Sequence, residues 1–367
     1  MRGRRCKGGV ETDLPLHPRP RKHFSTQTTY PCKPNRMSTS GKVVALLVAL
    51  FTIFGIYYFQ RNIVGERSLT GLTPTKETEY IIDADTANEV DDLFAIIGAI
   101  ARDDRGKTGP RLAGLTAAQF HTSPLASNRS AEESQVINEQ LAQLMGRPQL
   151  RTLVGTNRPL ESLSQPRKSP AAAFIAERAS RATPSNKLQV FVLGPCTNVA
   201  SAILLDPELA SVIHVRYLGF WYDPATGTYD KDEFNTGNDP IALNYLLDNP
   251  ALEFTVMTAT TSESLQFTRE ELDTQLPANH RLTNYLKNRW DTYDRWWTEE
   301  DPDKRQWTMW DVASLEAWFE PQWATLEKVY APEQNFTRKI GIYTAIEADS
   351  MKATYWEVVR AALETME

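Results

Sequence analysis

Five acidic side chains lie within ten consecutive positions of the chain, between a strand-like apolar run and a helix-like one. Carboxylates this close repel one another and raise each other's pKa unless a cation neutralises them, so the cluster predicts a bound hard divalent ion. The alternative is a solvated acidic turn, because Asp and Glu favour helix N-termini. Two adjacent aspartates flanked by apolar residues favour the metal site. The five residues are Asp83, Asp85, Glu89, Asp91 and Asp92.

Two further polar segments lie where an apolar run ends or begins. Residues 193–198 (LGPCTN) follow a strand-like run, and Thr197 or Asn198 can cap the helix that we expect next. Asp311 follows Trp310 and opens another apolar helix. Taken alone, each segment fits ordinary turn and cap chemistry.

A fourth segment, residues 232–240, is unusually polar for a stretch that precedes a helix. Pro240 fits the first position of that helix. Glu233 and Asn235 alternate with Phe234, so we expect the two polar side chains to point into a cleft together while the aromatic ring packs away from it.

The elements that must position these segments alternate between strands and helices. Strands separated by helices of this length predict an α/β fold, a Rossmann-like open and mostly parallel sheet with helices on both faces. The acidic segment then lies at the carboxyl end of a strand, where such sheets bind ligands. The predicted strands are 80–82, 112–117, 151–154, 188–193, 212–218 and 254–257, and the predicted helices are 92–101, 131–145, 170–179, 198–205, 240–247, 281–297, 310–318 and 354–365.

Charge and cysteine content exclude several classes of function. Of the total charge of −6, residues 1–42 carry +8, from ten Lys or Arg against two acids, which leaves −14 for the rest of the chain. An acidic body argues against nucleic acid as a ligand. The three cysteines, two of them in the basic tail, support neither a disulfide framework nor a cysteine-based zinc site.

Residues 43–59 form a run of seventeen uncharged residues with aromatics at its far end. The run predicts a single-pass membrane anchor, and the basic residues before it would keep the N-terminus cytoplasmic and send the remainder to the non-cytoplasmic side. A cleaved signal peptide is the alternative, but no small-residue cleavage site follows. The predicted organisation is therefore a basic, disordered tail (1–42), an anchor (43–59), a linker (60–78) and one catalytic domain (79–367).

In order and spacing, over roughly residues 79–320, the four segments together resemble the inosine-uridine preferring nucleoside hydrolase family. That family opens with an Asp-x-Asp loop ending in Asp-Asp, continues with Leu-Gly-Pro-x-Thr-Asn and Glu-Phe-Asn before Asp-Pro, and closes with a late Asp at the start of an apolar helix. The matching residues are Asp83, Asp85, Asp91 and Asp92, then residues 193–198, then 233–235 with Asp239 and Pro240, and last Asp311.

The resemblance implies a calcium-dependent hydrolase that cleaves the N-glycosyl bond of a small-molecule ribonucleoside and releases ribose and free base. It implies that Ca²⁺ is held by Asp85, Asp92, the backbone carbonyl of Thr197 and Asp311. All of these offer oxygen ligands, which suits calcium and not zinc.

The resemblance also assigns the remaining site residues. Asp85 would act as the base toward the attacking water, and Trp310, where many members have His, resembles the purine-preferring members, in which it stacks on the leaving base. The residues assigned to the sugar are Asp91, Glu233 and Asn235, with Asn88 as an added contact in the longer opening loop.

The sequence leaves two other functions open, and it is also compatible with a homo-oligomer. A non-catalytic nucleoside or sugar binder of the same fold would explain the departures at Trp310 and at Gln119, where many members have Gly-Asn. A haloacid-dehalogenase-like phosphatase would use Asp83 as nucleophile, but its motif needs Thr where Ala87 stands, and Thr86 falls one position early.

Overall fold

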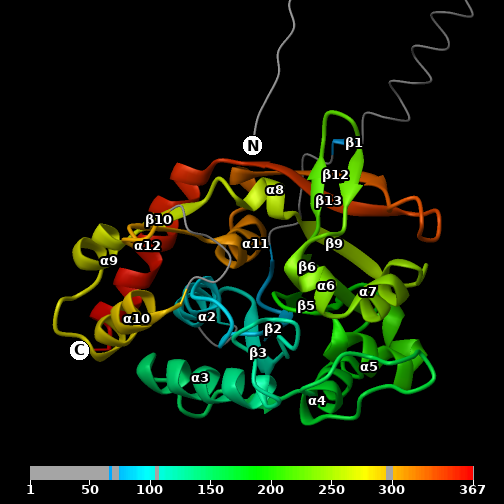
Figure 1. The fold of residues 1–367 in the computed structure, drawn as a ribbon, viewed down its shortest axis with the longest axis horizontal. Helices are drawn as coiled ribbons and strands as arrows, with labels where there is room; N and C mark the ends of the chain where they lie inside the picture. The colour runs from blue at the N-terminus through cyan, green and yellow to red at the C-terminus, as the bar shows by residue number, and fades with distance from the viewer. Residues whose placement is uncertain (1–65, 68–73, 104–106, 295–300, 367) are drawn as a thin grey trace, which may run out of the picture. The chain divides into compact units, whose positions relative to one another are not determined.

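The computed structural model describes residues 66–67, 74–103, 107–294 and 301–366. The chain divides into two compact units, 1–57 and 58–367, and the first lies wholly outside the described residues. The fold described below is that of the second unit (Figure 1).

A nine-stranded sheet forms its centre, with seven neighbouring strands parallel and two edge strands antiparallel. This arrangement confirms the predicted α/β class and mostly parallel sheet. In spatial order the strands are β1 (Glu66–Arg67), β12 (Ala324–Tyr330), β13 (Lys339–Ile346), β9 (Glu253–Met257), β6 (Ile213–Leu218), β5 (Leu188–Val192), β2 (Glu79–Ala84), β3 (Arg111–Ala117) and β4 (Thr152–Val154). Two small hairpins lie outside it, β7 (Trp221–Asp223) with β8 (Thr228–Asp230), and β10 (Gln266–Thr268) with β11 (Gln306–Thr308).

Helices cover both faces of this sheet, because the parallel strands carry apolar residues on both faces. On β2, Tyr80 and Ile82 belong to one core and Ile81 to the other. The first core also takes α2 (Asp91–Arg102), α3 (Ser130–Leu144), α10 (Arg281–Thr292), α11 (Trp310–Phe319) and α12 (Ala348–Glu364). The second takes α4 (Pro170–Ala179), α5 (Thr197–Leu205) and α7 (Pro240–Leu247).

The strand order reverses between β2 and β5. From β2 the chain runs outward to β3 and β4, and it then returns to the other side of β2 as β5, continuing to β6 and β9. The loops after β2 and β5 therefore diverge and leave a crevice at the carboxyl ends of these strands, which is where open α/β sheets bind ligands.

Several elements differ from those expected. The strands β1, β12 and β13 were not predicted, and neither were the short helices α6 (Phe234–Asn238), α8 (Ala259–Ser262) and α9 (Arg269–Gln275). The helix expected to run to residue 297 ends at Thr292, and α12 begins at Ala348, six residues before the expected start. Most residues of β12 are only partly buried and two are charged, so its apolar alternation is weak.

The prediction of a membrane anchor is wrong, and with it the membrane as a partner and the non-cytoplasmic location. Across the described ranges, no helix has the length and apolar character needed to span a bilayer. Residues 43–59, on which the prediction rested, lie outside those ranges.

Candidate active site

A cavity of about 450 Å³ opens at the crevice described above. Its walls come from the loop after β2, the start of α2, the ends of β5 and β6, the start of α6 and the start of α11. All but one of the predicted site residues line it. These are Asp85, Asn88, Asp91, Asp92, Glu233, Asn235, Trp310 and Asp311.

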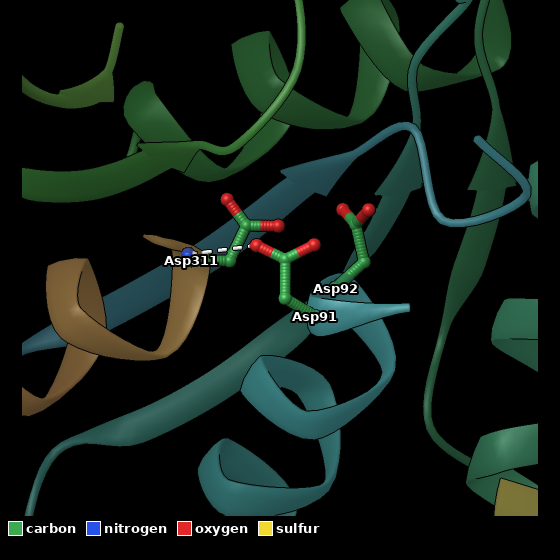
Figure 2. Close-up of side chains that lie close together, drawn as sticks. All are labelled: Asp91, Asp92 and Asp311. Carbon is green, nitrogen blue, oxygen red and sulfur yellow. Dashed lines mark hydrogen bonds between the residues drawn. The ribbon is translucent and has the colours of Figure 1, made fainter. Parts of the chain in front are cut away.

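Three aspartates form the acidic centre of this cavity (Figure 2). Asp91 and Asp92 open α2, Asp311 lies in the first turn of α11, and one carboxylate oxygen of each lies within 4.8 Å of the others. The backbone N–H of Asp311 donates to Asp91 Oδ2 at 3.2 Å, and all three side chains are buried. Two helix N-termini meeting here favour negative charge through their dipoles.

Asp85 follows β2 directly and is buried beside this centre. A Cβ atom at Gly194 would lie 2.8 Å from Asp85 Oδ1, so only glycine at the end of β5 allows the carboxylate its position. The backbone N–H of Asn88 donates to the Asp85 carbonyl at 2.7 Å, which makes a tight turn between the two residues. The sequence pointed to this Gly-Pro segment as a turn, a helix cap and part of the family resemblance, but not to the close approach of Gly194 to Asp85.

Burial raises the pKa of each of these carboxyls. The pKa of Asp91 rises to about 7, chiefly through loss of hydration, although backbone N–H groups oppose the rise. The pKa of Asp85 is raised by burial and by the charge of Asp92, and the pKa of Asp92 is raised by burial and by the charge of Asp91. Asp311 is raised by burial and by Asp91. Such a group of acids is stable in its charged form only beside a cation.

The oxygen atoms at this centre fit a divalent cation. Among the described residues, Asp85 Oδ2, Asn88 Oδ1, Asp92 Oδ1 and Asp311 Oδ1 are buried and receive no hydrogen bond. A buried acceptor without a donor is costly, and hard divalent ions take oxygen ligands. Asp91 belongs to the group of close oxygens, whereas the sequence assigned it to the sugar.

Thr197 is the predicted site residue that does not line the cavity. It begins α5, and its hydroxyl donates to Asp239 Oδ2 at 2.7 Å. Asp239 is the N-cap of α7 and also accepts from the backbone N–H groups of Leu160 and Ala242. The Thr197 side chain therefore links two helix starts behind the cavity wall.

Glu233 and Asn235 line the cavity from the start of α6, the former as its N-cap. Glu233 accepts from the backbone N–H groups of Phe220, Asn235 and Thr236 and from the Thr236 hydroxyl. The Asn235 amide donates to the carbonyls of Leu193 and Leu218, at 2.8 and 3.2 Å. These bonds fix both side chains at the carboxyl ends of β5 and β6.

Aromatic side chains complete the cavity. Trp310, at the start of α11, lines it beside Asp311, and Trp221 and Phe234 also line it. The expectation that Phe234 packs away from the cleft is therefore wrong. Trp307, three residues before Trp310, does not line the cavity: it is buried in the core, with its ring centre 5.0 Å from that of Tyr293.

Sequence reasoning missed a buried network beneath the acids. Asp83 accepts from the Thr116 hydroxyl at 2.6 Å and from the Asn198 amide at 2.8 Å, and the same amide donates to the Ala117 carbonyl at 3.2 Å. Burial raises the pKa of Asp83 to about 6. The first acid of the cluster thus ties β2 to β3 and α5, and no signal in the sequence marks these distant partners.

The sequence matches the family described as "Inosine-uridine preferring nucleoside hydrolase" over residues 80–339. No curated protein sequence matches the chain.

Solved structures with the same fold include a plant nucleoside hydrolase, with 15% identity, TM-score 0.60, and coverage of 78% of this chain and 99% of that one. A purine-preferring ribonucleoside hydrolase from Gardnerella vaginalis shares 16% identity at TM-score 0.59, over 78% and 99% of the two chains. A type III effector protein, solved with adenosine diphosphate ribose, shares 12% identity at TM-score 0.60, over 79% and 95%.

Proposed function

Because the chain belongs to the inosine-uridine preferring nucleoside hydrolase family, we propose that its cavity hydrolyses the N-glycosyl bond of ribonucleosides with the help of Ca²⁺ and with a preference for purines. Membership of the family makes the protein a hydrolase acting on N-glycosyl bonds, as the sequence predicted, and removes the phosphatase alternative. The ion, the substrate range and the roles of individual residues are the proposed part.

The observation that carries the proposal is the acidic centre beside an aromatic side chain. Cleavage of an N-glycosyl bond passes through a sugar with oxocarbenium character, and preorganised carboxylates stabilise that positive charge. Asp91, Asp92 and Asp311 converge in the same cavity that Trp310 lines.

We assign the ion to Asp92 and Asp311, with Asp85 and the Thr197 carbonyl as the further ligands that the resemblance implies. When bound, such an ion supplies Lewis-acid activation of a water molecule. Asp85 Oδ2, which receives no hydrogen bond from the described residues, would take the proton of the attacking water.

The sugar would be held by residues fixed on neighbouring elements. Asp91 is oriented by the Asp311 N–H, and Glu233 and Asn235 are oriented by backbone groups of β5, β6 and α6. The Asn88 amide oxygen is buried at the same wall and receives no hydrogen bond from the residues that the structure describes, so it can accept one from a hydroxyl. Preorganised polar groups of this kind favour a diol over a deoxysugar.

A nucleoside panel tests the proposal. The full chain is incubated in Ca²⁺ with inosine, adenosine, guanosine, uridine, cytidine and 2′-deoxyinosine, and free sugar is measured. We expect ribose release, fastest from the purine ribosides, and little release from the deoxynucleoside. No release from any member, by protein that binds Ca²⁺, would favour the non-catalytic binder.

A further inference from the structure

A second cavity, of about 750 Å³, lies at the amino-terminal ends of the parallel strands, at the other end of the sheet from the acidic cavity. Its wall includes residues that five strands place on one face of the sheet, next to the end of α11. The polar residues among them are Gln189 on β5, His214 and Arg216 on β6, Glu253 and Thr255 on β9, and Lys328 on β12, with Tyr343 on β13 beside them.

These polar residues occupy positions where the strand pattern calls for apolar ones. Two residues further along β5, the same face carries Phe191, and further along β6 and β9 it carries Leu218 and Met257, all in the core beneath α11 and its neighbours. The face therefore changes from apolar to polar toward the amino-terminal ends. Burying polar groups costs free energy unless they are paired, so a run of them across neighbouring strands needs an explanation.

Arg216 is the central cation of this cavity. Its Nε donates to Gln189 Oε1 at 2.8 Å, and its guanidinium lies 5.5 Å from the centre of the Trp318 ring. Within the described part of the chain, no carboxylate lies within ion-pair distance of it, and Nη2 forms no hydrogen bond. Burial lowers the pKa of this guanidinium. A partly buried arginine without a counter-ion can bind an anion through its free N–H groups.

Lys328 adds a second cation. Its Nζ forms no hydrogen bond or ion pair with the residues described by the structure, and its pKa is lowered by burial and by the charge of Arg216, despite the opposing charge of Glu253. The Glu253 carboxylate is engaged elsewhere, 3.3 Å from Lys187 Nζ and 3.6 Å from His214 Nδ1.

One row of the sheet connects the two cations. Thr255 pairs with both Arg216 and Gly341, and Gly341 pairs with Lys328. A Cβ at Gly341 would lie 2.7 Å from Thr255 Oγ1, so only glycine at this position leaves room for the Thr255 side chain. The cavity is therefore lined by a cation at each end of this row, with the Thr255 hydroxyl, which lies 2.8 Å from His214 Nε2, between them.

We propose that this cavity binds a phosphomonoester, with its phosphate group against Arg216 and Lys328. A planar guanidinium matches the oxygen geometry of phosphate, and an ammonium adds a second positive charge. A cavity of about 750 Å³ is far larger than a phosphate group, and Trp318 and Leu326 offer apolar surface to an organic part. The proposal is independent of the chemistry assigned to the acidic cavity.

Calorimetry on the full chain, in buffer without calcium, tests the site with inorganic phosphate, glycerol 3-phosphate and glycerol. We expect both phosphates to bind, glycerol 3-phosphate more tightly, and glycerol not to bind. Lys328→Met should weaken binding of both phosphates at least about tenfold. The matched control is Lys339→Met, an exposed lysine on the adjacent strand β13 and outside the cavity, which should bind as the wild type does.

A melting curve separates loss of the site from loss of the fold. Without ligand, Lys328→Met should melt at or above the wild-type temperature, because the substitution removes a partly buried charge that Arg216 repels. Arg216→Lys keeps the charge but loses the planar fork, and it too should weaken phosphate binding. No binding of either phosphate at about 10 mM, or equal binding by both lysine variants, would overturn the proposal. Equal affinity for the two phosphates would overturn its assignment to a phosphomonoester.

Discussion

Asp311 and Asp91 are 220 positions apart in the chain, and the backbone N–H of the first donates to a carboxylate oxygen of the second at 3.2 Å. The bond joins the first turn of α11 to the first turn of α2 (Figure 2). It brings two helix N-termini and three carboxylates together, and it positions Trp310, the residue before Asp311, in the wall of the acidic cavity.

Removal of divalent ions should lower the thermal stability of the protein. An ion present at 100 times its Kd stabilises the folded state by about 2.7 kcal/mol, and each kcal/mol moves Tm by about 2–4 °C in domains of 150–250 residues. We therefore expect chelator to lower Tm by several degrees and added Ca²⁺ to restore it. In Asp311→Asn the response to both should be greatly reduced. A wild-type Tm indifferent to chelator and to calcium would remove the proposed ion site.

Trp310→Ala should reduce kcat/KM for purine ribosides by roughly one to two powers of ten, because stacking of a base on an aromatic ring contributes about 1–3 kcal/mol. Pyrimidine ribosides, with a smaller ring face, should lose less. The measurement is a comparison of inosine and uridine hydrolysis, with Tm as the control. Equal losses for the two substrates together with a lower Tm would instead assign Trp310 to packing under α11.

Gly194→Ala should lower kcat by roughly ten- to a hundredfold. The new Cβ would lie 2.8 Å from Asp85 Oδ1 and would push the carboxylate out of position. A small displacement of a reacting group causes a loss of about this size. The matched control is Gly237→Ala, also at the carboxyl edge of the sheet, where a Cβ meets no atom within 4 Å. Steady-state kinetics on both variants measure the difference in kcat. If the two alanines have the same effect, the close approach of Gly194 to Asp85 is unimportant for turnover.

Asn198→Ala should destabilise the fold by about 1–3 kcal/mol, since the buried Asp83 carboxylate and the Ala117 carbonyl would each lose a donor. Chemical denaturation measures the free energy of unfolding. Asn284→Ala, an exposed position on α10, provides the comparison and should stay within about 0.5 kcal/mol of the wild type. A similar result for both variants would contradict the structural role given to this network.

Six of the seven parallel strands followed from local pattern, because each is rich in apolar residues and the helices between them are bounded by Pro, Thr and Asp. The strands β12 and β13 did not. Most residues of β12 are only partly buried and two are charged, and β13 follows it without an intervening helix, so the alternation of strands and helices did not indicate this pair. Within the acidic segment, sequence spacing identified the aspartates as a group. It could not distinguish Asp83, which long-range hydrogen bonds direct into the fold, from its neighbours.

The second cavity, at the amino-terminal ends of the strands, was also not predicted, because its residues come together only in the folded chain. Gln189, Arg216 and Lys328 lie far apart in the sequence, and only the pairing of their strands brings them to one face. The prediction of a membrane anchor was wrong because it rested on the apolar content of one local segment alone.

The most direct test of the central claim is the appearance of free ribose and hypoxanthine from inosine, followed over time with the full chain in Ca²⁺ and with Asp85→Asn under the same conditions. We expect equal amounts of the two products from the wild type, and a rate lower by at least about a thousandfold in the variant, with the fold retained. Hydrolysis that continues unchanged in Asp85→Asn, or no hydrolysis by the calcium-bound wild type, would contradict the claim.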